Sequence, residues 1–88
     1  MNRITFTAKA IRNLKQVDRR YYETIKQKIL MLVDFPNVQL DIKRLQGQIG
    51  KFRMRVGRYR IIFEVIDGEP KIIEIQLVAK RDERTYTH

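Results

Sequence analysis

The stretch that decides the fold is Lys51-Phe52-Arg53-Met54-Arg55-Val56-Gly57-Arg58-Tyr59-Arg60, in which five of the ten residues are basic and none is acidic. Basic and apolar residues alternate from Phe52 to Val56, and this period is typical of a β-strand with one buried face. Arg53 and Arg55 then point to the same side. A row of guanidinium groups on a rigid strand suits a phosphate backbone. The stretch therefore indicates a strand that binds nucleic acid.

Two further strands are expected downstream. Gly57-Arg58 makes a tight connection to a strand over Tyr59–Ile66, and Asp67-Gly68-Glu69-Pro70 is a hairpin turn before a strand over Lys71–Ala79. Alternation predicts which side chains share a face: Ile61, Phe63 and Val65 against Arg60, Ile62 and Glu64, and then Ile73, Ile75 and Leu77 against Glu74 and Gln76.

The first half of the chain is expected to hold one short strand and two helices. Arg3–Thr7 alternates like a strand, and Thr7 and Asp18 are residue types that cap helix N-termini. The apolar positions with helical spacing are Ala10, Ile11, Leu14 and Val17 in the first helix and Tyr22, Ile25, Ile29, Leu32 and Val33 in the second. Pro36 and Asn37 end the helical region. The predicted fold is a single α+β domain over residues 1–88, in the order β-α-α-β-β-β, with two helices packed on one face of an antiparallel sheet.

Composition narrows the class of protein. The 88 residues carry a net charge of +9 and no cysteine, so we expect an anionic partner and no disulfide or thiolate chemistry. The longest apolar run is too short to span a bilayer, and residues 1–5 have no signal-peptide core, which favours the cytoplasm and no membrane. RNA, DNA, a ribosome, a membrane surface and an acidic protein all remain possible partners from charge alone.

Most familiar catalytic sites are absent from the sequence. The one histidine, His88, is the last residue and cannot form a histidine pair or a Ser-His-Asp triad by itself. The carboxylates are scattered, and the glycine spacing fits neither a P-loop nor a dinucleotide fingerprint. We therefore expect no metal and no cofactor.

A second basic cluster, Lys80–Tyr86, follows the last strand. One interpretation is that the ends of the strands bring five side chains together around a concave site: Arg53, Arg55, Arg60, Arg81 and Tyr86. The alternative interpretation is that Arg81 and Arg84 form ion pairs with Asp82 or Glu83 and keep the C-terminal segment in solvent. The residues alone leave both readings open.

The motifs Lys43-Arg44-Leu45-Gln46-Gly47, Phe52–Val56, Tyr59–Val65 and Val78–Arg81, followed by Tyr86, resemble the RelE branch of the RelE/ParE toxin family of type II toxin–antitoxin modules. The resemblance covers nearly the whole chain. It implies an mRNA interferase that enters the ribosomal A site and cuts the messenger without metal. In that family the ribose 2′-hydroxyl attacks the adjacent phosphate, leaving a 2′,3′-cyclic phosphate and a 5′-hydroxyl.

The resemblance also implies roles for individual residues. The catalytic positions are Arg53, Arg55, Arg60, Arg81 and Tyr86, with Arg60 and Arg81 stabilising phosphate charge and Tyr86 transferring a proton or orienting a nucleotide. Contacts to RNA or the ribosome, including the ribosomal RNA of its small subunit, are assigned to Lys43, Arg44, Lys51, Arg58, Lys80 and Arg84. The stable partner implied is a cognate antitoxin, RelB-like or of another type II family.

The chain departs from the family pattern at the basic strand. RelE members carry lysines in the pair that arginine fills here at 53 and 55, and arginine is not deprotonated in proteins. Either Arg53 and Arg55 act only electrostatically, or the acid or base that transfers protons is Lys51, Lys80 or Tyr86. His88 is a less favoured candidate for the same role. Two other functions stay open: a ParE-like inhibitor of DNA gyrase, and a non-catalytic RNA-binding module.

Overall fold

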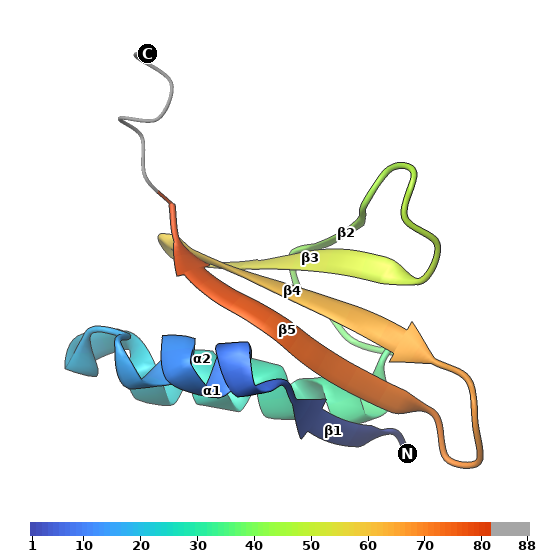
Figure 1. Cartoon of the computed structure of the whole chain (residues 1–88). Coiled ribbons are helices and arrows are strands. Elements are labelled where there is room, and N and C mark those ends of the chain that lie inside the picture. The colour runs from blue at the N-terminus through green and yellow to red at the C-terminus, as the bar shows by residue number, and fades with distance from the viewer. Residues whose placement is uncertain (82–88) are drawn as a thin grey trace.

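The chain folds into two layers, a five-stranded sheet and a pair of helices that cover one of its faces (Figure 1). The structure, a computed structural model, describes residues 1–81. Its elements are β1 (Arg3–Phe6), α1 (Ala8–Lys15), α2 (Arg19–Leu30), the 3-10 turn η1 (Met31–Asp34), β2 (Ile42–Arg44), β3 (Lys51–Val56), β4 (Tyr59–Ile66) and β5 (Ile72–Lys80). The α+β class and the helix pair on one sheet face are confirmed.

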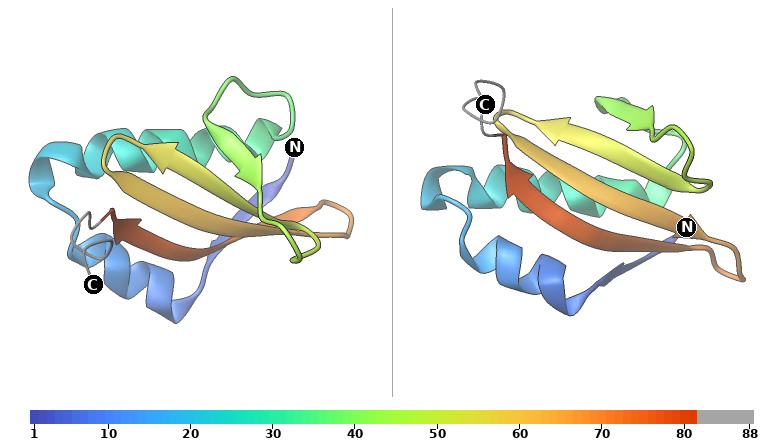
Figure 2. Two further views of the ribbon diagram at one scale, coloured as in Figure 1. Left: turned by 90° about the horizontal axis from the view of Figure 1, so that it is seen from above. Right: turned by 45° about the horizontal axis from the view of Figure 1, so that its top comes forward.

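The sheet order is β1-β5-β4-β3-β2, and it differs from the expected sheet in two ways. β1 pairs with β5 in parallel, with Ile4 opposite Ile73, whereas the other neighbours are antiparallel. The extra strand β2 forms the edge beyond β3, as both views in Figure 2 show. β2 has three residues, too few for an alternating pattern to be recognised, and its partner β3 decides its structure.

Both helices begin at the expected caps. The Thr7 side chain accepts a hydrogen bond from the Ala10 backbone N–H at 3.1 Å. The Asp18 carboxylate accepts one from the Arg20 N–H at 2.9 Å. Each cap satisfies a backbone donor that has no partner inside its helix.

The core lies between the helices and the inner face of the sheet. Phe63, Ile61 and Met54 are fully buried there, and Ile25 of α2 and Leu32 of η1 belong to the same buried cluster. The alternation predicted for β3 and β4 is therefore confirmed. At the margins the helical pattern includes residues outside the core, because Ile11 is 46% and Tyr22 37% exposed.

A β-bulge in β5 corrects one expectation. Ile62 pairs with Leu77, but the next residue, Phe63, pairs with Ile75, so Gln76 has no partner in the ladder. Beyond the bulge the side-chain alternation shifts by one residue. Val78 is buried in place of Leu77, which pairs with Ile62 on the outer face. The prediction that Leu77 shares the face of Ile73 and Ile75 is wrong, because a bulge changes the period without a local sequence signal.

Within residues 1–81 no helix combines the length and the apolar character needed to cross a membrane.

Candidate nucleic-acid interface

The helices lie against one face of the sheet, and no helix of the described residues covers the other face (Figure 1). We call this second face the outer face. β3 contributes Lys51, Arg53 and Arg55 to it, because the alternating Phe52, Met54 and Val56 pack with or against the core. The basic row predicted from the sequence therefore lies on a solvent-facing sheet surface.

The strand register brings the other predicted residues beside this row. Lys43 of β2 is opposite Arg53, and Arg60 of β4 is opposite Arg55. Neighbouring strands lie about 4.8 Å apart, a separation that long basic side chains easily bridge. Four of the predicted positions, Lys43, Arg53, Arg55 and Arg60, thus form one patch.

Arg55 is the member of this patch whose charge is compensated. Its Nε lies 3.1 Å from Oδ2 of Asp41, and its backbone N–H donates to the Asp41 carbonyl at 2.9 Å. The other ion pair among residues 1–81 joins Arg20 to Asp18. In the described part of the chain, the charges of Lys43, Lys51, Arg53 and Arg60 therefore remain available to an anionic ligand. Asp41 was missed by sequence reasoning, since only the β2–β3 pairing brings it to Arg55.

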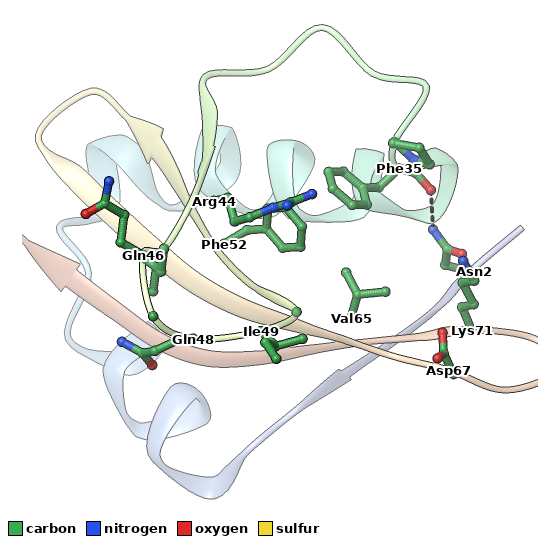
Figure 3. A pocket seen from close by; sticks show the side chains of 14 residues that line it. Asn2, Phe35, Arg44, Gln46, Gln48, Ile49, Phe52, Val65, Asp67 and Lys71 are labelled. Carbon is green, nitrogen blue, oxygen red and sulfur yellow. Dashed lines mark hydrogen bonds between the residues drawn. The ribbon is translucent and has the colours of Figure 1, made fainter.

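Arg44 lies apart from the patch. It pairs with Phe52 in the ladder, so it faces the helix side, and its guanidinium carbon is 5.9 Å from the centre of the Phe52 ring. Arg44 lines a cavity of about 1130 Å³, and Figure 3 shows its side chain there. Side chains that line this cavity include Phe35, Arg44, Gln48, Ile49, Phe52 and Val65. Lys43 and Arg44, adjacent in sequence, thus lie on opposite faces of the sheet, Lys43 on the outer face and Arg44 on the helix side.

Of the remaining predicted cations, Arg58, Lys80 and Arg81 lie at the end of the sheet where β5 stops. The Arg81 backbone N–H donates to the carbonyl of Arg58 at 2.6 Å, which fixes Arg81 beside the β3–β4 turn. Lys80 is opposite Tyr59, whose ring is buried on the helix side. Arg81 therefore lies near the Arg60 end of the patch, whereas Lys80 belongs to the other face. Tyr86, Arg84 and His88 lie outside the described residues.

The helix side of this end contains an ion pair. The Arg20 side chain donates to the Asp18 carboxylate, and together with the Arg20 backbone N–H it lowers the pKa of Asp18 from 3.8 to about 2. The same carboxylate raises the pKa of Arg20. The Asp18 backbone N–H donates to the Tyr59 hydroxyl at 3.1 Å. These contacts join the start of α2 to the sheet.

The outer face also carries two carboxylates that sequence reasoning did not single out. Glu64 and Glu74 are cross-strand partners in β4 and β5. Nε2 of Gln76, the bulge residue, donates to Oε1 of Glu64 at 2.8 Å and to Oε1 of Glu74 at 2.9 Å. Strand alternation places Glu64 on the Arg60 side, but its neighbours depend on register and on the bulge. Across residues 1–81, no three His, Cys, Asp or Glu residues gather as metal ligands would.

Comparison with known proteins agrees with this architecture. A family model described as the ParE toxin of the type II toxin–antitoxin system parDE matches residues 4–85. No curated protein shows significant similarity to the chain. The isolated RelE toxin of Escherichia coli is similar in structure, with a TM-score of 0.79 and 19% identity over 99% of this chain and 93% of that one.

Two complexes contain toxins that are closer in sequence. The RelB–RelE antitoxin–toxin complex of Methanococcus jannaschii matches with a TM-score of 0.73 and 29% identity, covering 94% of this chain and 95% of that one. The RelBE2 toxin–antitoxin complex of Mycobacterium tuberculosis matches with a TM-score of 0.74 and 27% identity, covering 91% and 98%. The family match spans nearly the whole chain, and the fold is that of the RelE structures. The chain belongs to the RelE/ParE superfamily of toxins from type II toxin–antitoxin systems.

Proposed function

We propose that the chain is a ribosome-dependent endoribonuclease that cleaves messenger RNA in the A site and so inhibits translation in the cytoplasm. The observation that carries this proposal is the outer basic patch. Arg53 and Arg60 project from adjacent strands without a carboxylate partner in residues 1–81, and Lys43 and Lys51 lie beside them. Such a surface suits a single RNA strand in the confined space of a ribosome.

Cleavage of RNA by its 2′-hydroxyl requires positive charge held in a fixed position near the phosphate. When the 2′-hydroxyl attacks, negative charge grows on the phosphate oxygens, and preoriented cations stabilise it without reorganisation. Arg53 and Arg60 stand on hydrogen-bonded strands, and the backbone of Arg81 is tied to Arg58. In this proposal Arg60 and Arg81 stabilise phosphate charge, and Arg53 holds the scissile region of the RNA strand. Tyr86 keeps its proposed role in proton transfer or nucleotide orientation.

The proposed stable partner is an antitoxin. The similar toxins of Methanococcus jannaschii and Mycobacterium tuberculosis are seen in complex with their antitoxins. A net charge of +9 favours an acidic antitoxin, which would approach by electrostatic steering. Antitoxin bound over Arg53 and Arg60 would exclude RNA and silence the toxin.

A second function is favoured by one specific observation, the ParE description of the matching family. A ParE-like protein would inhibit DNA gyrase and leave messenger intact. The fold serves both activities, so the residues of the outer face must discriminate between them. The basic patch supports the ribonuclease, because cations held on neighbouring strands suit a phosphate whose negative charge grows during cleavage.

The test is primer extension on messenger in translating ribosomes treated with the purified protein. We expect A-site cleavage by the wild type and a loss of about 100-fold or more with Arg60→Ala. Lys26→Ala, which removes an exposed charge from α2, is the matched control and should cleave normally. Intact messenger together with blocked gyrase supercoiling would establish the ParE-like function. If the protein binds ribosomes but neither cleaves messenger nor inhibits gyrase, the result supports a non-catalytic RNA-binding module.

A further inference from the structure

Lys51 and Glu64 form a cross-strand pair on the outer face. The Cβ atoms of such a pair lie about 4.5–5.5 Å apart, so a lysine and a glutamate side chain leave the sheet side by side there. Both side chains are half-buried, and within residues 1–81 no ion pair closer than 4 Å engages either of them. A proton acceptor and a proton donor are thus adjacent without neutralising each other by direct contact.

Glu64 is held in place from the opposite strand. Gln76 donates to its Oε1 at 2.8 Å, and a carboxylate has a second oxygen, Oε2, that can accept a proton. Gln76 is itself fixed, because it is the bulge residue and its backbone carbonyl accepts from the Thr7 hydroxyl at 3.3 Å. Bulges often re-aim a side chain next to an active site.

The same network tolerates an unfavourable arrangement. Glu64 and Glu74 are like charges directly opposite each other on neighbouring strands, which normally destabilises a sheet. Proteins violate such local rules at functional sites. Gln76 offsets the repulsion by donating one N–H to each carboxylate.

Ile62 marks where a reacting phosphate would sit. It lies between Arg60 and Glu64 on the outer side of β4, and Arg53 is its cross-strand partner. Side chains on one face of a strand are spaced by about 6.7 Å and strands by about 4.8 Å. A phosphate above Ile62 is therefore within reach of Arg53, Arg60, Lys51 and Glu64 together. Leu77, opposite Ile62, extends the apolar floor.

Resting on the function proposed above, we propose that Glu64 is the general base and Lys51 the general acid of RNA cleavage. Glu64 takes the proton of the 2′-hydroxyl as the 2′-oxygen bonds to phosphorus. The bond from phosphorus to the 5′-oxygen breaks, and the Lys51 ammonium gives its proton to that oxygen. The products are a 2′,3′-cyclic phosphate and a 5′-hydroxyl. Arg53 and Arg60, which cannot transfer protons, stabilise the phosphate charge together with Arg81. Of the two roles proposed for Tyr86, nucleotide orientation is then the one that remains.

The experiment is single-turnover cleavage on ribosomes carrying either normal messenger or messenger with sulfur in place of the 5′-bridging oxygen at the scissile bond. A thiolate leaves without a proton. Lys51→Arg keeps the charge but loses the transferable proton, so it should slow cleavage of normal messenger by about 10²–10⁴-fold. The sulfur substrate should restore its rate to near the wild-type value. Arg60→Ala should remain slow on both substrates.

Glu64→Gln keeps the size of the side chain and removes the base. Both substrates should be cleaved about 10²–10⁴-fold more slowly, and the acidic limb of the pH–rate profile should disappear. The controls are Glu23→Gln and Lys26→Arg on the exposed side of α2, which should stay within twofold of wild type. Ribosome binding and circular dichroism confirm that each variant is folded.

The outcomes separate the two proposals. If the wild type cleaves and Glu64→Gln cleaves equally fast with the same pH profile, the assignment of the base is overturned and the ribonuclease stands. A Lys51→Arg variant that the sulfur substrate does not rescue overturns the assignment of the acid. If the wild type leaves both messengers intact, the ribonuclease proposal fails and this one with it.

Discussion

Asp41, the residue just before β2, is joined to Arg55 of β3 by an Nε–Oδ2 contact of 3.1 Å and by a backbone hydrogen bond of 2.9 Å. The pair is solvent-accessible, with the side chains 50% and 36% exposed. Because an exposed ion pair contributes little to the free energy of unfolding, the main effect of Asp41 is to compensate the charge of Arg55 on the outer face.

Asp41→Asn should strengthen RNA binding, because it removes the carboxylate that compensates Arg55. One more cation facing phosphate steepens the slope of log affinity against log salt by about 0.7 for a single strand. The free energy of unfolding should change by about 0.5 kcal/mol or less. Titration of a short oligoribonucleotide at several salt concentrations checks this. Weaker binding would mean instead that Arg55 needs Asp41 to hold its orientation.

Acid should destabilise the fold through Asp18. Its pKa in the folded protein is about 2, below the ordinary 3.8, so its contribution is complete above pH 3.8 and is lost as the pH falls through 2. Asp18→Asn keeps a cap acceptor but has no charge to titrate. The difference in urea midpoint between wild type and variant should shrink from pH 4 to pH 2. A constant difference would contradict the Asp18–Arg20 origin of the shift.

Phe63→Ala should be the most damaging of the aromatic truncations. Phe63 is fully buried, and its ring centre lies 5.4 Å from those of both Phe35 and Phe52. The loss of burial and the cavity left behind cost about 3–5 kcal/mol. Equilibrium denaturation measures this, with Phe63→Leu as the milder control at roughly 1–1.5 kcal/mol. A loss below that of the leucine variant would show that the aromatic cluster collapses around the gap.

Gln76→Leu should destabilise the sheet by about 1–2 kcal/mol, because two carboxylates lose their shared donor and face each other directly. Adding Glu74→Gln should restore part of this loss, since it removes the repulsion. A double-mutant cycle in low and high salt isolates the coupling. Additive effects would mean that the Gln76 bridge does not link the two carboxylates energetically.

Local features of the fold could be predicted from the sequence because local interactions decide them. Thr7 and Asp18 cap their helices through residues two or three positions away. The alternation in β3 and β4 needs only one buried face. By contrast, the parallel β1–β5 pair and the bulge at Gln76 depend on partners distant in sequence, and three-residue β2 carries no pattern of its own.

The candidate site divides in the same way. Alternation correctly predicts that Arg53 and Arg55 share a face, and the strand register places Arg60 opposite Arg55 on that face. It does not predict that Arg44 turns to Phe52 on the other face, nor that Asp41 compensates Arg55. Glu64 could be placed on the outer face, but its neighbours Lys51 and Gln76 come from other strands. The catalytic roles themselves stay predictions.

The parallel pairing of β1 with β5 has a consequence for synthesis of the protein. Arg3 meets Ile72 in the ladder, so β1 finds its sheet partner only after all the intervening residues have been made. β5 also lies between β1 and β4, and without it the sheet is divided. Contacts so distant in sequence form late. A nascent chain therefore lacks a complete outer face while most of it is being translated, and the sheet can close only after β5 has been made.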